Sequence, residues 1–67
     1  MHVAKIIELV GSSDKSWEDA AKVAIKKAGQ TLRGLRGVEV IGWTGVIKDN
    51  QISEYRATVK ISFGIED

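Results

Sequence analysis

Two long strand-like segments joined at Asp49-Asn50 place the strongest constraint on the fold of this 67-residue chain. Residues 37–48 and 51–66 are rich in β-branched residues, and the dipeptide between them tolerates the positive φ angles of a two-residue hairpin turn. Closing the hairpin there sets Lys48 opposite Gln51, so that the numbers of every pair add up to 99. The sequence therefore predicts an antiparallel hairpin with a defined register.

This register assigns residues to two faces of a sheet. On one face it predicts the pairs Val38 with Ile61, Val40 with Val59, Gly42 with Ala57 and Thr44 with Tyr55. On the other face it predicts Glu39 with Lys60, Ile41 with Thr58, Trp43 with Arg56 and Ile47 with Ile52. The first face is apolar, and the second contains an opposite-charge pair and a cation-π pair. We expect a covering layer on the first face.

The segment before the hairpin predicts a strand and a helix. Residues 3–10 form a β-branched, largely apolar run that Gly11 is expected to end, and because both faces of this strand are apolar, one of them is expected to meet another subunit. A helix is expected from Trp17 to about Arg33, with Ser16 as N-cap, Ser13 as the rival cap and Gly34 as the C-terminal cap.

The predicted order is strand, helix and two hairpin strands, an α+β fold with the pattern β-α-β-β. One helix packs on one face of a three-stranded antiparallel sheet. The helix is expected to bury its apolar stripe against Val38, Val40, Tyr55, Val59, Ile61 and Phe63. Four apolar residues stay on the open face and are expected to be buried in an assembly, namely Ile41, Trp43, Ile47 and Ile52.

Length and composition favour a single domain, residues 1–67, that gains stability by self-association. A chain this short buries only about 60% of its unfolded surface, and without cysteine it has neither disulfides nor a thiolate metal site. The net charge is only +1, which argues against a nucleic-acid partner. No apolar run approaches the ~20 residues of a membrane span and no signal peptide is apparent, so we expect a cytoplasmic protein.

The sequence offers no catalytic constellation and no predicted metal site. It lacks a cysteine nucleophile and a phosphate-binding Gly-rich loop, and its one histidine, His2, is expected to be idle near a terminus. Gly42 and Gly45 flank Trp43 inside a strand, where bulges or close subunit approach explain them better. Scattered acidic residues would bind a hard cation only where symmetry brings copies together.

Several segments of the chain resemble the dodecins. They are Ile-Glu-Leu-Val-Gly-Ser-Ser at 7–13, Ser-Trp-Glu-Asp-Ala-Ala at 16–21, Ala-Gly-Gln-Thr-Leu-Arg at 28–33, Val-Glu-Val at 38–40 and Tyr-Arg-Ala-Thr-Val-Lys-Ile-Ser-Phe at 55–63. The resemblance covers essentially the whole chain. It implies a hollow homododecamer that binds riboflavin, FMN or a related flavin at subunit interfaces without turning it over, a role in flavin storage and protection.

The resemblance also indicates where the flavin site departs from the family pattern. Gly37 stands where flavin-binding dodecins carry the tryptophan that stacks on the isoalloxazine ring, and Arg56 stands where they carry a glutamine that hydrogen-bonds the flavin. Losing one aromatic stack weakens the binding free energy of the flavin by on the order of 1 kcal/mol or more. The candidate ligand-binding residues are therefore Gly37 and Arg56. A third candidate is Trp43, as a substitute for the missing aromatic ring.

Each candidate residue has two interpretations. Trp43 either fills a subunit contact or stacks under Arg56, or else it offers a planar ligand a substitute aromatic platform. Six residues along the strand, about 20 Å, separate Trp43 from Gly37, so the Trp43 that replaces the missing ring would have to come from a symmetry-related subunit. Arg56 is half of a cross-strand pair or an anchor for an anion. Trp17 is expected to pack in the core.

Two functions follow from these observations. The first is non-catalytic storage of a flavin or a similar planar ligand at the interfaces of a hollow dodecamer. The second is an assembly of the same fold that has lost flavin binding and serves as a structural shell or binds ions or anions.

Overall fold

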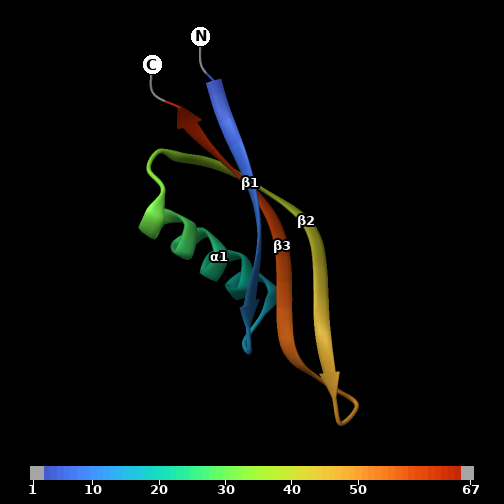
Figure 1. The fold of residues 1–67 in the computed structure, drawn as a ribbon. Coiled ribbons are helices and arrows are strands. Elements are labelled where there is room, and N and C mark those ends of the chain that lie inside the picture. Colours follow the sequence, from blue (N-terminus) through green and yellow to red (C-terminus); the bar gives the residue numbers. More distant parts are fainter. Residues whose placement is uncertain (1–2, 66–67) are drawn as a thin grey trace.

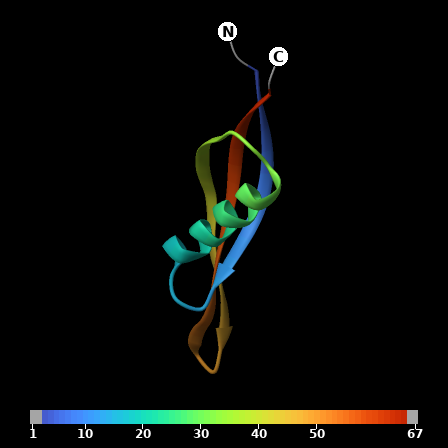
Figure 2. The same cartoon turned by 90° about the vertical axis from the view of Figure 1, so that its left-hand side faces the viewer.

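The computed structural model describes residues 3–65 and has the predicted β-α-β-β order (Figure 1). The elements are β1 (Val3–Ser13), α1 (Trp17–Thr31), β2 (Leu35–Lys48) and β3 (Gln51–Ile65). The strands form one antiparallel sheet in the order β1-β3-β2, and α1 crosses one of its faces (Figure 2). We call this side the helix face and the opposite side the open face. His2, Glu66 and Asp67 lie outside the described residues.

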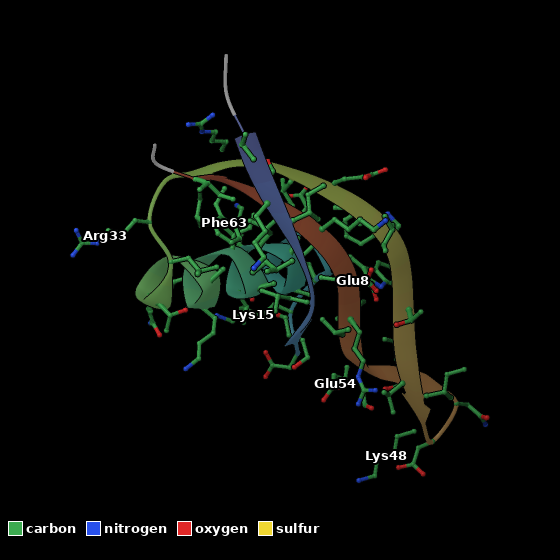
Figure 3. All side chains as sticks on the ribbon, turned by 45° about the horizontal axis from the view of Figure 1, so that its top comes forward. Glu8, Lys15, Arg33, Lys48, Glu54 and Phe63 are labelled. Atoms are coloured by element: carbon green, nitrogen blue, oxygen red, sulfur yellow. The ribbon has the colours of Figure 1, made fainter. Side chains whose placement is uncertain are left out.

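The hairpin turn lies where the sequence predicts it. Asp49 and Asn50 both have positive φ, 54° and 63°, which is the conformation of a type I′ turn, whose backbone twist matches that of the flanking strands. Lys48 and Gln51 close the turn as a pair. Lys48 marks this far end of the molecule in Figure 3.

The predicted register is correct at both ends of the hairpin and wrong in the middle. Val38 with Ile61, Glu39 with Lys60, Val40 with Val59 and Ile47 with Ile52 are pairs. Between them the register is shifted by one residue, so that Gly42 pairs with Thr58, Trp43 with Ala57, Thr44 with Arg56 and Gly45 with Tyr55.

Two β-bulges cause this shift. Ile41 is an extra residue in β2 between Val40 and Gly42, and Ser53 is an extra residue in β3 that restores the original register. Because side chains alternate between faces, an inserted residue turns the following side chains to the other face. Trp43 pairs with the buried Ala57 and thus lies on the helix face, so its predicted position on the open face beside Arg56 is wrong. The predicted open-face positions of Ile47 and Ile52 are wrong for the same reason, because their pair also lies on the helix face.

The helix begins as predicted and ends earlier. The Ser16 hydroxyl oxygen accepts a hydrogen bond from the Asp19 backbone N–H at 3.0 Å, which makes Ser16 the N-cap, and the Ser13 hydroxyl donates to the Asp19 carboxylate at 2.6 Å. The helix ends at Thr31, two residues before Arg33, because Leu32 already has an extended backbone. The predicted cap at Gly34 is wrong: Leu32 is the C-cap, and its N–H donates to the Ala28 carbonyl oxygen at 2.9 Å. Gly34, with φ of 70°, provides the reversal into β2.

Small side chains allow α1 to lie close to the sheet. The buried core consists of Ala20, Ala21, Ala24, Ala28, Ala57, Val59 and Ile61. The expectation that Gly11 ends the first strand is wrong. Gly11 is buried beneath α1, and β1 continues to Ser13. Phe63 is half-buried near α1 (Figure 3), whereas Val38, expected in the core, is 47% exposed because it lies at the edge of the sheet.

The single chain is more extended than a compact monomer of its size. Its accessible surface is 5207 Å², against about 4,200 Å² for a compact protein of this mass. Its radius of gyration is 13.7 Å, against about 11 Å for a compact domain of the same length. Within residues 3–65, no helix reaches the length and apolarity that crossing a membrane requires.

Candidate functional site

The candidate residue Gly37 lines a depression on the open face. Gly37 and Ile6 pair with Ser62 from its two sides, so these three residues form one row across the sheet. The depression has a volume of about 240 Å³ and is lined by Ile6, Gly37, Val38, Glu39, Lys60 and Ser62. We call it the Gly37 depression. It combines two apolar side chains with a carboxylate, an ammonium and a hydroxyl group, which is a mixture that binds a small polar molecule.

Lys60 lies between two carboxylates in the next row of the sheet. It pairs with Glu39 on β2, as the sequence predicts, and with Glu8 on β1. Among residues 3–65, however, the only ion pair is the one between Arg56 and Glu54. The Lys60 ammonium group is therefore not tied to either neighbouring strand and is available to a ligand in the Gly37 depression.

The Gly37 depression contains no aromatic side chain. The glycine leaves open the position from which a larger side chain would cover the pocket, since a Cβ built on it would lie 3.2 Å from the Ser62 hydroxyl oxygen and meet nothing else closely. Of the residues that line it, none has a ring that could stack on a planar ligand. A stacking partner would have to come from another copy of the chain.

Arg56 lies far from the Gly37 depression and has its own partner. Its Nε donates a hydrogen bond to the Glu54 carboxylate at 2.6 Å, on the same face of β3. Six residues of β3 separate Arg56 from Ser62, the partner of Gly37, which corresponds to about 20 Å. One chain therefore does not bring Gly37 and Arg56 together, and the expected pair of Arg56 with Trp43 is replaced by the pair with Glu54.

Trp43 lies on the opposite side of the sheet from the Gly37 depression. Its side chain is 51% exposed and, with Trp17 and Glu18 from the start of α1, lines an open groove of about 540 Å³ on the helix face. Sequence reasoning missed this grouping because it depends on the bulge at Ile41. The glycines at 42 and 45, which favoured a bulge, were the only signal for it.

Trp17 links the start of α1 to the hairpin. Its indole N–H donates to the Thr44 carbonyl oxygen at 2.8 Å, and its ring meets Tyr55 edge-on with a centroid distance of 4.8 Å. The side chain is half-buried and lies outside the buried cluster, so the expectation that it packs in the core is only partly met. Residues 3–65 contain no group of three or more side chains able to hold a metal ion.

Residues 3–66 match the dodecin family. The chain is 35% identical to a dodecin from Thermus thermophilus over 97% of this chain and 94% of that protein. It is also 32% identical to a calcium dodecin from Mycobacterium tuberculosis, over 94% of this chain and 89% of that one.

The solved structures that resemble this chain are dodecins as well. A crystal structure of a Thermus thermophilus protein superposes with a TM-score of 0.96 at 34% identity, covering 100% of this chain and 98% of that one. The Streptomyces coelicolor dodecin superposes with a TM-score of 0.95 at 33% identity, covering 98% of this chain and 94% of that one. The calcium dodecin of Mycobacterium tuberculosis, described with a novel calcium-binding site, gives 0.84 at 30% identity, covering 96% and 91%.

Proposed function

This chain belongs to the dodecin family, and on that premise we propose that it is a non-catalytic binding protein that works in the cytoplasm as a shell of twelve copies. Dodecameric assembly is known for this fold. The proposal rests on one observation above all: the isolated chain leaves much of its apolar surface in contact with water.

This uncovered surface lies on both faces of the sheet and at the hairpin. The exposed large apolar residues are Val3, Ile6, Val10, Val23, Val38, Ile41, Trp43, Ile47, Ile52 and Ile65. Fully burying one such side chain stabilises an assembly by about 1.5–3 kcal/mol. Among residues 3–65, by contrast, the fully buried core contains only two side chains larger than alanine. Contacts with other copies therefore supply a large share of the apolar burial that this fold needs.

We propose the Gly37 depression as the small-molecule site, completed by a neighbouring copy. Family membership makes a flavin the first ligand to test. Because the depression has no aromatic lining, we expect riboflavin and FMN to bind it through polar contacts with Lys60, Glu39 and Ser62, and with lower affinity than an indole stack would give.

A second candidate function is an assembly without flavin. Two observations favour it: no ring lines the depression, and the guanidinium group of Arg56 is held by Glu54. The Mycobacterium tuberculosis relative is a calcium dodecin. Since residues 3–65 of one chain contain no group of three metal-ligating side chains, calcium would need carboxylates from several copies.

One series of measurements separates these functions. Light scattering should give a mass near twelve times 7.3 kDa, about 88 kDa, and a mass of one or two chains would overturn the assembly. On the assembled protein, saturable quenching of riboflavin or FMN fluorescence supports the flavin site. No quenching, together with calcium binding by calorimetry on the same sample, supports the second function instead.

A further inference from the structure

The groove lined by Trp17, Glu18 and Trp43 is a second candidate site, on the face opposite the Gly37 depression. We call it the indole groove. Its volume, about 540 Å³, lies within the range of small-molecule sites. It shares no lining residue with the Gly37 depression, so binding there does not depend on the ligand of that depression. It does require that Trp43, one of the exposed apolar residues named above, stays uncovered in the assembly.

A local irregularity of the hairpin creates this groove. The bulge at Ile41 turns Trp43 to the helix face, and the bulge at Ser53 returns the strands to their original register five pairs later, after Val46. The shift also turns Ile47 and Ile52 to the helix face, where the Ile52 Cγ2 would lie 3.5 Å from a Cβ built on Gly45. Bulges that reorient one side chain are common beside functional sites.

The other wall of the groove is held in place from three sides. The Trp17 indole N–H is bonded to the Thr44 carbonyl oxygen, and its ring lies edge-on to Tyr55. Gly45 lies beneath the ring, since a Cβ built there would be 4.0 Å from the indole Cζ2. With its N–H already used, Trp17 presents only its apolar surface to a ligand.

The polar group of the groove is a carboxylate. Glu18 is exposed in the first turn of α1 and forms no ion pair with another residue among 3–65. Two indoles and one carboxylate repel an anion, and a single carboxylate is too few oxygen ligands for a metal ion.

We infer that the indole groove binds a small organic cation with apolar substituents on its nitrogen, such as a quaternary ammonium compound. The electron-rich faces of tryptophan attract such cations, and a nearby carboxylate adds charge attraction. An alkylated ammonium ion also loses less hydration than a primary ammonium ion when it meets an apolar wall. The attraction to the indole faces and to the carboxylate favours this cation over a neutral apolar ligand, and its weaker hydration favours it over a primary ammonium ion.

The test uses the assembled protein, with choline as the probe and dimethylbutanol, its neutral carbon isostere, as the matched control. Tryptophan fluorescence and calorimetry should show saturable choline binding and at least about fivefold weaker binding of the isostere. Equal affinity for the two compounds, or no binding of choline, would overturn the inference. So would failure of acrylamide to quench Trp43 in the assembly, because a neighbouring copy would then fill the groove.

Three substitutions test the residues. Glu18→Gln keeps the shape of the side chain and should weaken choline binding about three- to fivefold. Trp43→Ala should abolish saturable binding, whereas Trp43→Phe, which keeps an aromatic face, should stay within about threefold of the unaltered protein. Circular dichroism and light scattering verify that each variant folds and assembles. Unchanged choline affinity in correctly assembled Glu18→Gln and Trp43→Ala variants contradicts the assignment, whatever the flavin titration gives.

Discussion

Gly11 of β1 lies directly beneath Ala24 of α1, and a Cβ built on Gly11 would stand 2.9 Å from the Ala24 Cβ. It would also collide with the carbonyl oxygen of Ala20. The close approach of helix and sheet therefore depends on a missing side chain in the strand as much as on the alanines of the helix. It also explains why a glycine occurs inside a continuous strand.

Gly11→Ala should destabilise the fold by about 1–3 kcal/mol, because α1 must move away from the sheet to make room for the methyl group. The measurement is the urea midpoint at fixed protein concentration, since the stability of an oligomer depends on concentration. Gly29→Ala is the matched control. Its Cβ would make an ordinary 3.6 Å contact with Leu35, and alanine in a helix is more stable than glycine by about 0.5–1 kcal/mol. Equal effects of the two substitutions would contradict this account.

Ser16→Ala should cost about 1 kcal/mol of stability, because the Asp19 N–H loses its capping partner. Ser13→Ala removes the hydrogen bond to the Asp19 carboxylate and the one that the Ser13 hydroxyl oxygen accepts from the Lys15 N–H, but leaves the Ser16 cap intact. Ser12→Ala, an exposed serine on the open face, should change the urea midpoint little. A Ser16→Ala variant as stable as Ser12→Ala would show that the cap contributes nothing.

Asn50→Gly should stabilise the hairpin by about 0.5 kcal/mol, while Asn50→Ala should destabilise it by about 1 kcal/mol. The reason is the φ of 63°, which glycine adopts freely and alanine only against steric repulsion. Both variants shorten the side chain, so thermal unfolding of the pair isolates the backbone effect. The opposite order of stability would rule out the left-handed turn conformation.

The hairpin shows how far the sequence determines this fold. The turn at Asp49, the pairing of Val40 with Val59 and the N-cap at Ser16 were predictable, because each depends on residues close together in sequence or on simple alternation. The face of Trp43 was not predictable. Alternation assumes an uninterrupted ladder, and a bulge is a local choice between two nearly equal pairings that packing decides.

The candidate site was predictable only in part for the same reason. Gly37 does line a depression on the open face, which the position of the residue in the predicted hairpin allows. Arg56 and Trp43 lie elsewhere, one held by Glu54 and the other turned to the helix face. Arg56 is separated from Gly37 by its distance along the strand, and Trp43 by lying on the other face of the sheet. Neither separation within one chain shows which residues a second copy brings to the interface.

Gly37→Trp should raise flavin affinity at least about tenfold, because one added aromatic stack contributes about 1.4 kcal/mol. The new side chain enters the depression beside Ser62, whose hydroxyl oxygen lies 3.2 Å from the position of the added Cβ and must rotate away. Gly37→Ala is the matched control, since it adds the Cβ without the ring. Quenching of riboflavin and FMN fluorescence gives both affinities on assembled protein. If Gly37→Trp binds flavin no better than Gly37→Ala, the depression is not a flavin site that lacks only its stacking ring, and the assembly without flavin becomes the better account of this chain.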